Sequence, residues 1–468
     1  MEFRNYQQND YEALHRFLVA LCKDDEEHRN WNWARLEWMM WHPGFEAEHS
    51  GLISLWIDKG QVVAAAIYDM SFGEAFCATL PGYESIKKEV LDYAYQEFQD
   101  KDGLKIAVSD DSRKEVEALK AAGYSSTKHG ETLLRLDLGK SLSKKAPKGI
   151  SLIEFNPYEN LEEFQWLLWQ GFDHGSDRKE FEQNCEKTTQ KRPNFNEILN
   201  IAAKNEAGEL VAFCGVWYLP ETDYAYVEPV CVIPSYRGKG IGKAVVYEAL
   251  RKAKSLGAKK AYVLSDNEFY LKLGFEKAKH FTFYHKKAKS LVANGLSYRM
   301  LRLLGKGKGG YSYLVEREGK RVVFKQIHHE PCSFYSFGNK IEAEQRDYQR
   351  LVDAGIRVPK LIDIDLEREV IVKELVNGKI IFDMVAADEP VDEYITQVRE
   401  MAAQAKAVGL NIDFFPTNFI VQDGLLYYID YECNPYMDEW SFERWAIRYW
   451  AKTPEFEAHY QERKRRGE

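Results

Sequence analysis

The stretch Pro234-Ser-Tyr-Arg-Gly-Lys-Gly-Ile-Gly242 lies between an apolar run at 225–232 and a helical pattern at 243–253. The apolar run has the length and composition of a buried strand, and the later pattern repeats apolar residues at helical spacing. The sequence therefore predicts a strand, a glycine turn and a helix in direct succession.

Gly238, Gly240 and Gly242 let the backbone approach a ligand closely and point successive N–H groups in one direction. Because the turn opens a helix, whose free N–H groups and dipole favour negative charge, we expect a pyrophosphate there, with Arg237 as a second donor. A Rossmann dinucleotide site is the alternative, but it requires G-x-G-x-x-G and an acidic residue about twenty positions later. The glycine spacing differs here, and Lys260 stands in that region.

The motif V-x-P-x-x-R-G-K-G-I-G, at 232–242, resembles the acetyl-CoA-binding motif of the GNAT N-acetyltransferase superfamily. Downstream, Asn267-Glu-Phe-Tyr-Leu-Lys-Leu-Gly-Phe275 resembles that family's next helix and turn. The resemblance implies a mixed β-sheet domain at 149–288 that binds acetyl-CoA or another acyl-CoA. It assigns cofactor contacts to Val230, Cys231, Val232, Arg237, Gly238, Lys239, Gly240, Ile241, Gly242 and Asn267.

Acyl transfer from a thioester to an amine needs a base for the amine, a donor for the carbonyl oxygen and an acid for the leaving thiolate. The resemblance places the acid on Tyr270. Glu228, on the strand before the turn, is our candidate base, with Glu221 or Asp223 as alternatives. Cys231 is flanked by apolar residues, which raise a thiol pKa and argue against a nucleophile.

An internal repeat precedes this block, because Pro81 and Gly123 recur as Pro234 and Gly274 about 150 positions later. We therefore expect a first GNAT-like domain at 1–140. It lacks the glycine cradle, since Glu84, Lys87 and Glu89 replace Arg237, Gly240 and Gly242. Its expected role is structural or substrate-shaping.

The composition limits the setting of the protein. The 468 residues suggest about three domains. A formal net charge of −9 argues against a nucleic-acid partner, and no apolar run is long enough for a membrane span. Seven scattered cysteines without metal-ligand spacing favour a reducing, cytoplasmic compartment.

The third block, 298–468, opens with a glycine-rich hairpin that carries Gly305, Gly307 and Gly310. A strand with Lys325 and a helix with Glu344 follow. Such a hairpin covers the phosphates of a nucleotide, and a lysine held by a glutamate neutralises phosphate charge.

Asp413 and Asn418 have the D-x-x-x-x-N spacing of a kinase catalytic loop, and Asp430 follows the next strand. In this order the block resembles the protein-kinase-like fold, nearest to lipopolysaccharide-kinase-like and aminoglycoside-phosphotransferase-like proteins. The resemblance implies ATP or GTP with Mg²⁺, metal ligands Asn418 and Asp430, and Asp413 as the catalytic residue that orients the accepting hydroxyl. Asn411, Tyr431-Glu432 and a short C-terminal lobe depart from the family pattern.

The sequence thus predicts an α+β and α/β multidomain protein, with two GNAT-like mixed β-sheet domains and a small two-lobed kinase-like domain. The expected function is an acyl-CoA-dependent N-acetyltransferase for a small-molecule or peptide amine, with a second kinase activity. Two alternatives are a phosphotransferase that uses the GNAT pair for recognition and a non-catalytic acetyl-CoA or nucleotide sensor. The acceptor and the oligomeric state are not specified by the sequence.

Overall fold

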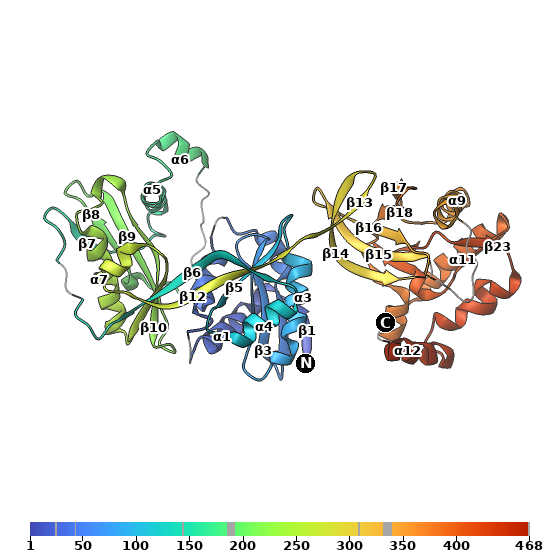
Figure 1. The fold of residues 1–468 in the computed structure, drawn as a ribbon, viewed down its shortest axis with the longest axis horizontal. Helices are drawn as coiled ribbons and strands as arrows, with labels where there is room; N and C mark the ends of the chain where they lie inside the picture. Colours follow the sequence, from blue (N-terminus) through green and yellow to red (C-terminus); the bar gives the residue numbers. More distant parts are fainter. Residues whose placement is uncertain are drawn as a thin grey trace. The chain divides into compact units, whose positions relative to one another are not determined.

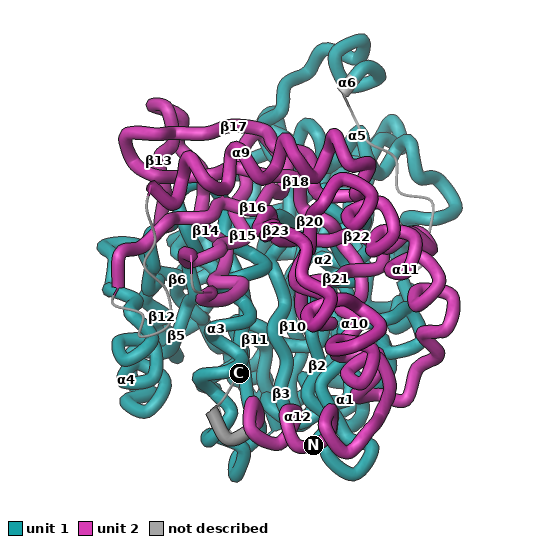
Figure 2. The backbone as a smooth tube through the Cα atoms, turned by 90° about the vertical axis from the view of Figure 1, so that its right-hand side faces the viewer, with its two compact units in different colours: residues 1–288 teal, residues 289–468 magenta. Residues whose placement is uncertain are grey.

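The structure is a computed structural model that describes the chain except residues 24–25, 43, 143–144, 185–191, 308, 331–338 and 467–468. The described residues form two compact units, 1–288 and 289–468 (Figure 2). No helix among these residues is long and apolar enough to cross a membrane.

The first unit contains a twelve-stranded sheet with the strand order β1-β2-β3-β4-β5-β12-β6-β11-β10-β9-β8-β7 (Figure 1). Most neighbours are antiparallel, but β4 pairs in parallel with β5, and β10 with β11. The strands are β1 (Glu2–Asn5), β2 (Ser54–Asp58), β3 (Gln61–Tyr68), β4 (Glu74–Thr79), β5 (Gly103–Ser109), β6 (Ser125–Asp137), β7 (Ser151–Glu154), β8 (Asn200–Lys204), β9 (Leu210–Tyr218), β10 (Tyr224–Val232), β11 (Lys260–Leu264) and β12 (Glu276–Lys287).

The helices of this unit divide between the two halves of the repeat. The first half has α1 (Tyr11–Leu21), α2 (Trp33–Met40), α3 (Lys87–Phe98) and α4 (Arg113–Ala121). The second half has α5 (Leu161–Gly171), α6 (Arg178–Asn184), α7 (Ile241–Ser255) and α8 (Glu268–Lys272). The predicted strand, glycine turn and helix are confirmed as β10, a 3₁₀ turn at Pro234–Tyr236, and α7.

The last strands of the two halves are exchanged. β12, from the second half, pairs with β5 of the first half, whereas β6, from the first half, pairs with β11 of the second. β6 and β12 also pair with each other and run side by side between the halves (Figure 1). The two GNAT-like halves therefore share one continuous sheet.

Because of this exchange, each half contributes side chains to the hydrophobic core of the other half. Leu134 and Leu136 of β6 pack in the core of the second half, and Phe281 and Tyr284 of β12 pack in the core of the first. Burying each such side chain stabilises the fold by about 1.5–3 kcal/mol. Neither half can lose its partner without opening its own core.

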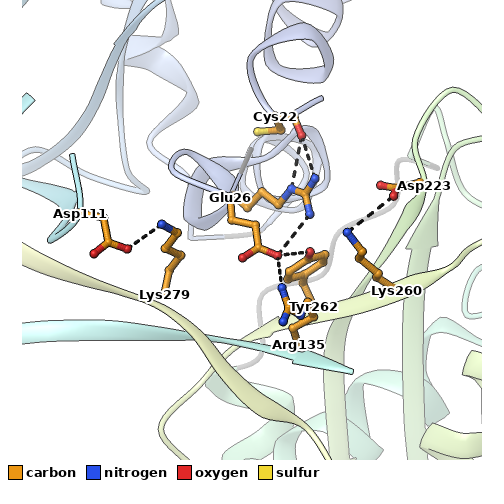
Figure 3. A network of polar contacts seen from close by, with 9 residues as sticks. Cys22, Glu26, Asp111, Arg135, Asp223, Lys260, Tyr262 and Lys279 are labelled. Atoms are coloured by element: carbon orange, nitrogen blue, oxygen red, sulfur yellow. Dashed lines mark hydrogen bonds and ion pairs between the residues drawn. The ribbon is translucent and has the colours of Figure 1, made fainter. Parts of the chain in front are cut away.

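A polar network at the same junction ties the loop after α1 to the second half (Figure 3). The Glu26 carboxylate accepts hydrogen bonds from the Tyr262 hydroxyl of β11 and, at 2.9 Å, from the Arg135 guanidinium of β6. The Arg29 guanidinium donates to the Cys22 carbonyl and lies 4.6 and 4.7 Å from the ring centres of Tyr224 and Tyr262. This buried cation on two aromatic faces adds directional contacts to the shared core.

The second unit opens with a six-stranded antiparallel sheet ordered β13-β14-β15-β16-β18-β17. It begins at Lys289 rather than at 298, because β13 pairs with β14. Its strands are β13 (Lys289–Ala293), β14 (Leu296–Lys306), β15 (Gly310–Arg317), β16 (Lys320–Ile327), β17 (Leu361–Asp365) and β18 (Val370–Glu374), and α9 (Lys340–Asp353) lies between β16 and β17 in the chain.

The rest of this unit is a mainly helical part with its own core, built around Phe414, Phe419, Tyr428 and Trp450. Small sheets interrupt the helices. The elements are α10 (Ile381–Ala386), α11 (Asp392–Ala407) and α12 (Pro454–Arg466), with β19 (Lys379–Ile380), β20 (Leu410–Ile412), β21 (Phe419–Gln422), β22 (Leu425–Tyr428) and β23 (Cys433–Pro435).

Candidate active site

The parallel strands β10 and β11 separate halfway along their length. They pair at Tyr224↔Lys260, Ala225↔Ala261 and Tyr226↔Tyr262, and no further β10–β11 pair occurs in the part of the chain that the structure describes. A register shift between Val227 and Val230 bends β10 at this point. The end of β10 consequently presents backbone groups to the space beside it instead of to β11.

A cavity of about 680 Å³ occupies this space. It is bounded by the end of β10, the glycine turn, α7 and α8. The structure therefore brings together most of the predicted cofactor residues, and the lining comprises Val230, Cys231, Val232, Arg237, Gly238, Gly240, Ile241, Gly242, Asn267 and Tyr270, together with Gly171, Phe172, Asp173, Tyr236, Lys243, Phe269, Lys272 and Leu273.

The glycine turn has the conformation that an anion cradle requires. Gly238 and Gly240 have φ of 74° and 81°, in the left-handed region where side chains are disfavoured. Gly240 is the N-cap of α7 and provides no capping side chain. A Cβ on Gly242 would lie 3.1 Å from the Phe269 ring, so this position also needs close backbone approach. The first N–H groups of α7 are left to a ligand.

Arg237 lines the cavity and is also held by the protein. Its Nε donates to the Val232 carbonyl at 3.0 Å, and one terminal nitrogen contacts the Gly171 carbonyl at 2.8 Å and the Asp173 carboxylate at 3.0 Å. These contacts connect the end of α5 to the end of β10 and fix the position of the guanidinium at the cavity wall.

Lys239 and Asn267 are only partly placed as predicted. The Lys239 ammonium lies 4.5 Å from the centre of the Tyr236 ring and lines a neighbouring cavity rather than this one. The Asn267 side chain lines the cavity, but its Oδ1 accepts from the Phe269 N–H at 2.9 Å and so caps α8. Capping fixes the direction in which α8 presents Tyr270.

Tyr270 is partly buried between Phe269 and Phe275, with ring centres 5.1 and 5.6 Å away. Burial, with a smaller contribution from the neighbouring Cys214 and Glu228 side chains, raises the pKa of Tyr270 well above its usual value. Its hydroxyl is therefore protonated at neutral pH. A protonated hydroxyl in this cavity is able to donate to a developing thiolate.

Glu228 lies at the bend of β10 and does not line the cavity. Burial raises the pKa of Glu228, while Arg35 of the first half and a hydrogen bond from Tyr226 oppose that rise. The Trp217 indole donates to the Glu228 carbonyl at 2.9 Å, which helps to hold the bend. The alternative base Asp223 stands before β10 and is 3.9 Å from the Lys260 ammonium, at the opposite end of the strand.

Cys231 packs against the end of α5, where a Cβ on Gly171 would lie 2.6 Å from the Cys231 Cβ. Burial raises the pKa of Cys231 to about 12. The thiol is therefore protonated and tightly packed, which agrees with a structural residue.

The corresponding gap in the first half is filled by a side chain. Among the described residues, β4 and β5 pair only at Glu74↔Lys105 and Ala75↔Ile106. Lys87, at the position of Gly240, donates to the Cys77 carbonyl of β4 at 2.8 Å and forms an ion pair with Glu115 of α4. An internal ammonium thus satisfies the strand carbonyl and occupies the region that the glycine turn leaves open in the second half.

In the second unit, the structure joins three of the predicted residues from three separate segments. The Lys325 ammonium of β16 lies 2.6 Å from a Glu344 carboxylate oxygen of α9 and 3.5 Å from an Asp430 oxygen. A Cβ on Gly309 would lie 3.1 Å from Glu344 and 3.6 Å from the Lys325 ammonium, so the glycine hairpin passes over this pair. The predicted glycines shape that hairpin, because the Gly307 N–H donates to the Gly310 carbonyl at 2.9 Å. Gly305 lies just before it in β14.

In the second unit, Asp413 and Asn418 line a cavity of about 870 Å³ together with the aromatic side chains Phe415, Trp440 and Trp445. The Asn418 amide donates to the Asp413 carbonyl at 3.3 Å. The Ile429 N–H donates to the Asn418 carbonyl at 2.9 Å, which connects this loop to Asp430.

Sequence reasoning missed one charged residue here. Lys373 of β18 is 7% exposed, and its ammonium donates to the Ile429 carbonyl at 2.5 Å. A lysine inside an apolar strand indicates a buried charge that needs a partner. Spacing alone does not show which groups that lysine contacts.

Residues 160–275 match the model of the acetyltransferase (GNAT) family, so the chain contains a GNAT acetyltransferase domain. Solved structures similar to this chain include a GCN5-related N-acetyltransferase from Sphaerobacter thermophilus (14% identity, 61% of this chain, 95% of that chain, TM-score 0.39). A tandem GNAT protein from the clavulanic acid biosynthesis pathway has 15% identity over 61% of this chain and 98% of that chain, with a TM-score of 0.43. A GNAT-family acetyltransferase from Colwellia psychrerythraea has 15% identity over 61% of this chain and 100% of that chain, with a TM-score of 0.38.

Proposed function

We propose that the domain at 149–288 transfers an acyl group from acetyl-CoA or another acyl-CoA to an amine of a small molecule or peptide. The observation that carries this proposal is the single cavity between β10 and α8. It combines an uncapped helix start, the exposed edge of β10 and the Tyr270 hydroxyl. The helix start suits a pyrophosphate, and the edge of β10 suits the amide groups of pantetheine. The Tyr270 hydroxyl suits a leaving thiolate.

The proposed reaction proceeds by direct attack. Glu228 accepts a proton from the acceptor ammonium, directly or through water, and the free amine attacks the thioester carbonyl carbon. The N–C bond forms and the C–S bond breaks. N–H groups near Cys231 and Val232 stabilise the negative carbonyl oxygen, and Tyr270 gives its proton to the thiolate. The attacking nitrogen loses its second proton as the amide forms, and this proton returns Tyr270 to its protonated state.

The first half, at 1–140, supports this site without binding a cofactor of its own. Lys87 closes its counterpart of the cavity, whereas Arg35 acts on the charge of Glu228. We assign to this half a structural and acceptor-shaping role.

Calorimetry with acetyl-CoA and a pair of glycine variants tests the proposal. A Cβ at Gly238 meets no atom within 4 Å and would enter the cavity, so Gly238→Ala should weaken binding at least about tenfold, or 1.4 kcal/mol. Gly208→Ala is the control, because Gly208 also has positive φ and open space but lies in the β8–β9 turn. Equal affinities in both variants would contradict a cradle at Gly238.

A second function is favoured by the contacts of Lys325 with Glu344 and Asp430. We propose that residues 298–468 bind ATP or GTP with Mg²⁺ and transfer the terminal phosphoryl group to a hydroxyl. Lys325 would neutralise phosphate charge, Asn418 and Asp430 would hold the metal, and Asp413 would orient the accepting hydroxyl.

Thermal shift of the full chain with millimolar ATP or GTP, with and without Mg²⁺, tests this second function. Asp430→Asn should remove the Mg²⁺-dependent shift, and Asp413→Asn should keep the shift but lose phosphoryl transfer. Asp392→Asn, at an exposed carboxylate in the same unit, is the control. If the parent chain shows no shift, the phosphotransferase proposal fails; a shift without turnover supports a nucleotide sensor.

A further inference from the structure

Four charged side chains converge in the second unit at the proposed nucleotide site. Lys325, Glu344 and Asp430 are in direct contact, and the Asp430 side chain is the most exposed of the three, at 31%. Lys373 enters from β18, the strand next to β16 in the sheet. Two positive and two negative charges therefore share a largely buried space.

Lys373 touches the residues on both sides of Asp430. Its ammonium donates to the carbonyl of Ile429 and lies 4.6 Å from the centre of the Tyr431 ring. Tyr431 is itself fixed, because its hydroxyl donates to the Pro359 carbonyl at 2.6 Å. Ile429 and Tyr431, the two neighbours of Asp430 in the chain, therefore both contact the Lys373 ammonium.

A buried ammonium on a neutral carbonyl is costly unless nearby negative charge compensates for its lost hydration. Glu344 and Asp430 supply that charge, but Lys325 alone would already balance one of them. With Lys373 the four charges balance. Charge balance and the hydrogen bond to the Ile429 carbonyl therefore both place Lys373 beside Asp430.

We propose that Lys373 is a positioning residue of the nucleotide site, which holds the Ile429–Asp430–Tyr431 turn so that the ionised Asp430 carboxylate is presented to Mg²⁺. This inference rests on the proposed phosphotransferase function. Lys373 acts through Asp430 and is not assigned a contact with the reacting phosphoryl group.

The charges around Lys373 give this role a pH signature. Burial and the neighbouring Lys325 lower the pKa of Lys373 to about 8, against the opposing effects of Asp430 and Glu344. Asp430 and Glu344 raise the pKa of Lys325 despite its burial. Lys325 and Lys373 hold the pKa of Asp430 below its usual value despite its burial. The pKa of Tyr431 is raised by burial. Lys373 is consequently the member of this group that loses its charge near pH 8.

The experiment measures ATP binding to the full chain by calorimetry over a range of Mg²⁺ concentrations. At pH 7.5, Lys373→Met should raise the Mg²⁺ concentration needed for half-maximal binding about 10- to 100-fold, the effect typical of residues that orient a metal ligand. Lys373→Arg retains the charge and should recover most of this loss. Lys87→Met is the matched control, because Lys87 is an equally buried lysine on a backbone carbonyl in the first unit.

Between pH 7 and 9, Mg²⁺-dependent ATP binding by the parent chain should weaken as pH rises, and binding by Lys373→Arg should not. If Lys373→Met does not fold, this comparison still decides the question. Identical pH profiles, or unchanged Mg²⁺ dependence in Lys373→Met, would overturn the positioning role alone. Absence of ATP and GTP binding by the parent chain would overturn the phosphotransferase function and this inference with it.

Discussion

At the level of single residues, the proposed reaction has Tyr270 donate a proton and Glu228 accept one. The raised pKa of Tyr270 keeps its hydroxyl protonated, and the raised pKa of Glu228 brings a carboxylate closer to neutral pH. A group that donates and a group that accepts a proton are thereby provided near one cavity. Residue type already separates a phenol from a carboxyl group, and burial raises the pKa of both.

We expect Tyr270→Phe to lower kcat for acyl transfer about 100-fold while leaving the affinity for acetyl-CoA unchanged, because the hydroxyl is used mainly when the thiolate forms. Steady-state kinetics and calorimetry check the two parts. Tyr247→Phe is the control: the Tyr247 hydroxyl donates to the Leu273 carbonyl at 2.8 Å, so its loss should cost about 1 kcal/mol of stability and spare kcat. Unchanged kcat in Tyr270→Phe would return Tyr270 to a packing role.

The pH dependence of kcat/KM tests Glu228. A base works only when deprotonated, so activity should rise as pH rises through the raised pKa of Glu228, and Glu228→Gln should remove this rise. Because Arg35 favours the ionised form, Arg35→Met should move the rise to higher pH. A profile that Glu228→Gln leaves intact would assign the base elsewhere.

At the scale of elements, the two halves use the same strand geometry in opposite ways. β4 and β10 both separate from their parallel neighbours after two or three pairs. In the second half the glycine turn leaves the gap open, and in the first half Lys87 and Glu115 close it. At the position of Gly240, the first half thus has a lysine in an internal ion pair where the second half has a glycine.

Replacing Lys87 with alanine should destabilise the first unit by up to about 3 kcal/mol, because Glu115 would lose its buried partner. Chemical denaturation measures this change. Acetyl-CoA should still bind at one site per chain, since the first half lacks the glycines of the cradle. A second binding site in Lys87→Ala would show that the lysine alone blocks the first half.

At the scale of the whole molecule, the exchange of β6 and β12 makes the two halves one folding unit. Each half completes the other's sheet and contributes leucine or aromatic side chains to its core. Separate expression of 149–288 would leave β11 without β6 and expose the core residues that β6 covers.

A protease site inserted between residues 145 and 146 tests this organisation. After cleavage, fragments 1–145 and 146–468 should remain associated in size-exclusion chromatography, because both sheet pairing and core packing hold them together. Separation without denaturant would contradict the exchange. The uncleaved variant, carrying the same insertion, is the control.

Features that depend on neighbours along the chain were predictable from sequence. Glycine conformations and the start of α7 are local, so the strand, turn and helix around 234–242 follow from spacing. The helix within 267–275 was expected from the resemblance to the GNAT motif, and its cap by Asn267 is also local. The repeat and the order of the charged residues in the second unit were also visible. Their joint use as a nucleotide site stays a prediction.

Contacts between residues far apart in the chain could not be predicted from local sequence. Arg237 reaches a carbonyl 66 positions away, and Lys373 reaches one 56 positions away. The strand exchange is equally invisible to spacing, because β6 and β12 carry the same pattern whichever neighbour they pair with. Sequence pattern fixes what an element is, whereas burial and pairing energy, which depend on the whole fold, fix what it touches.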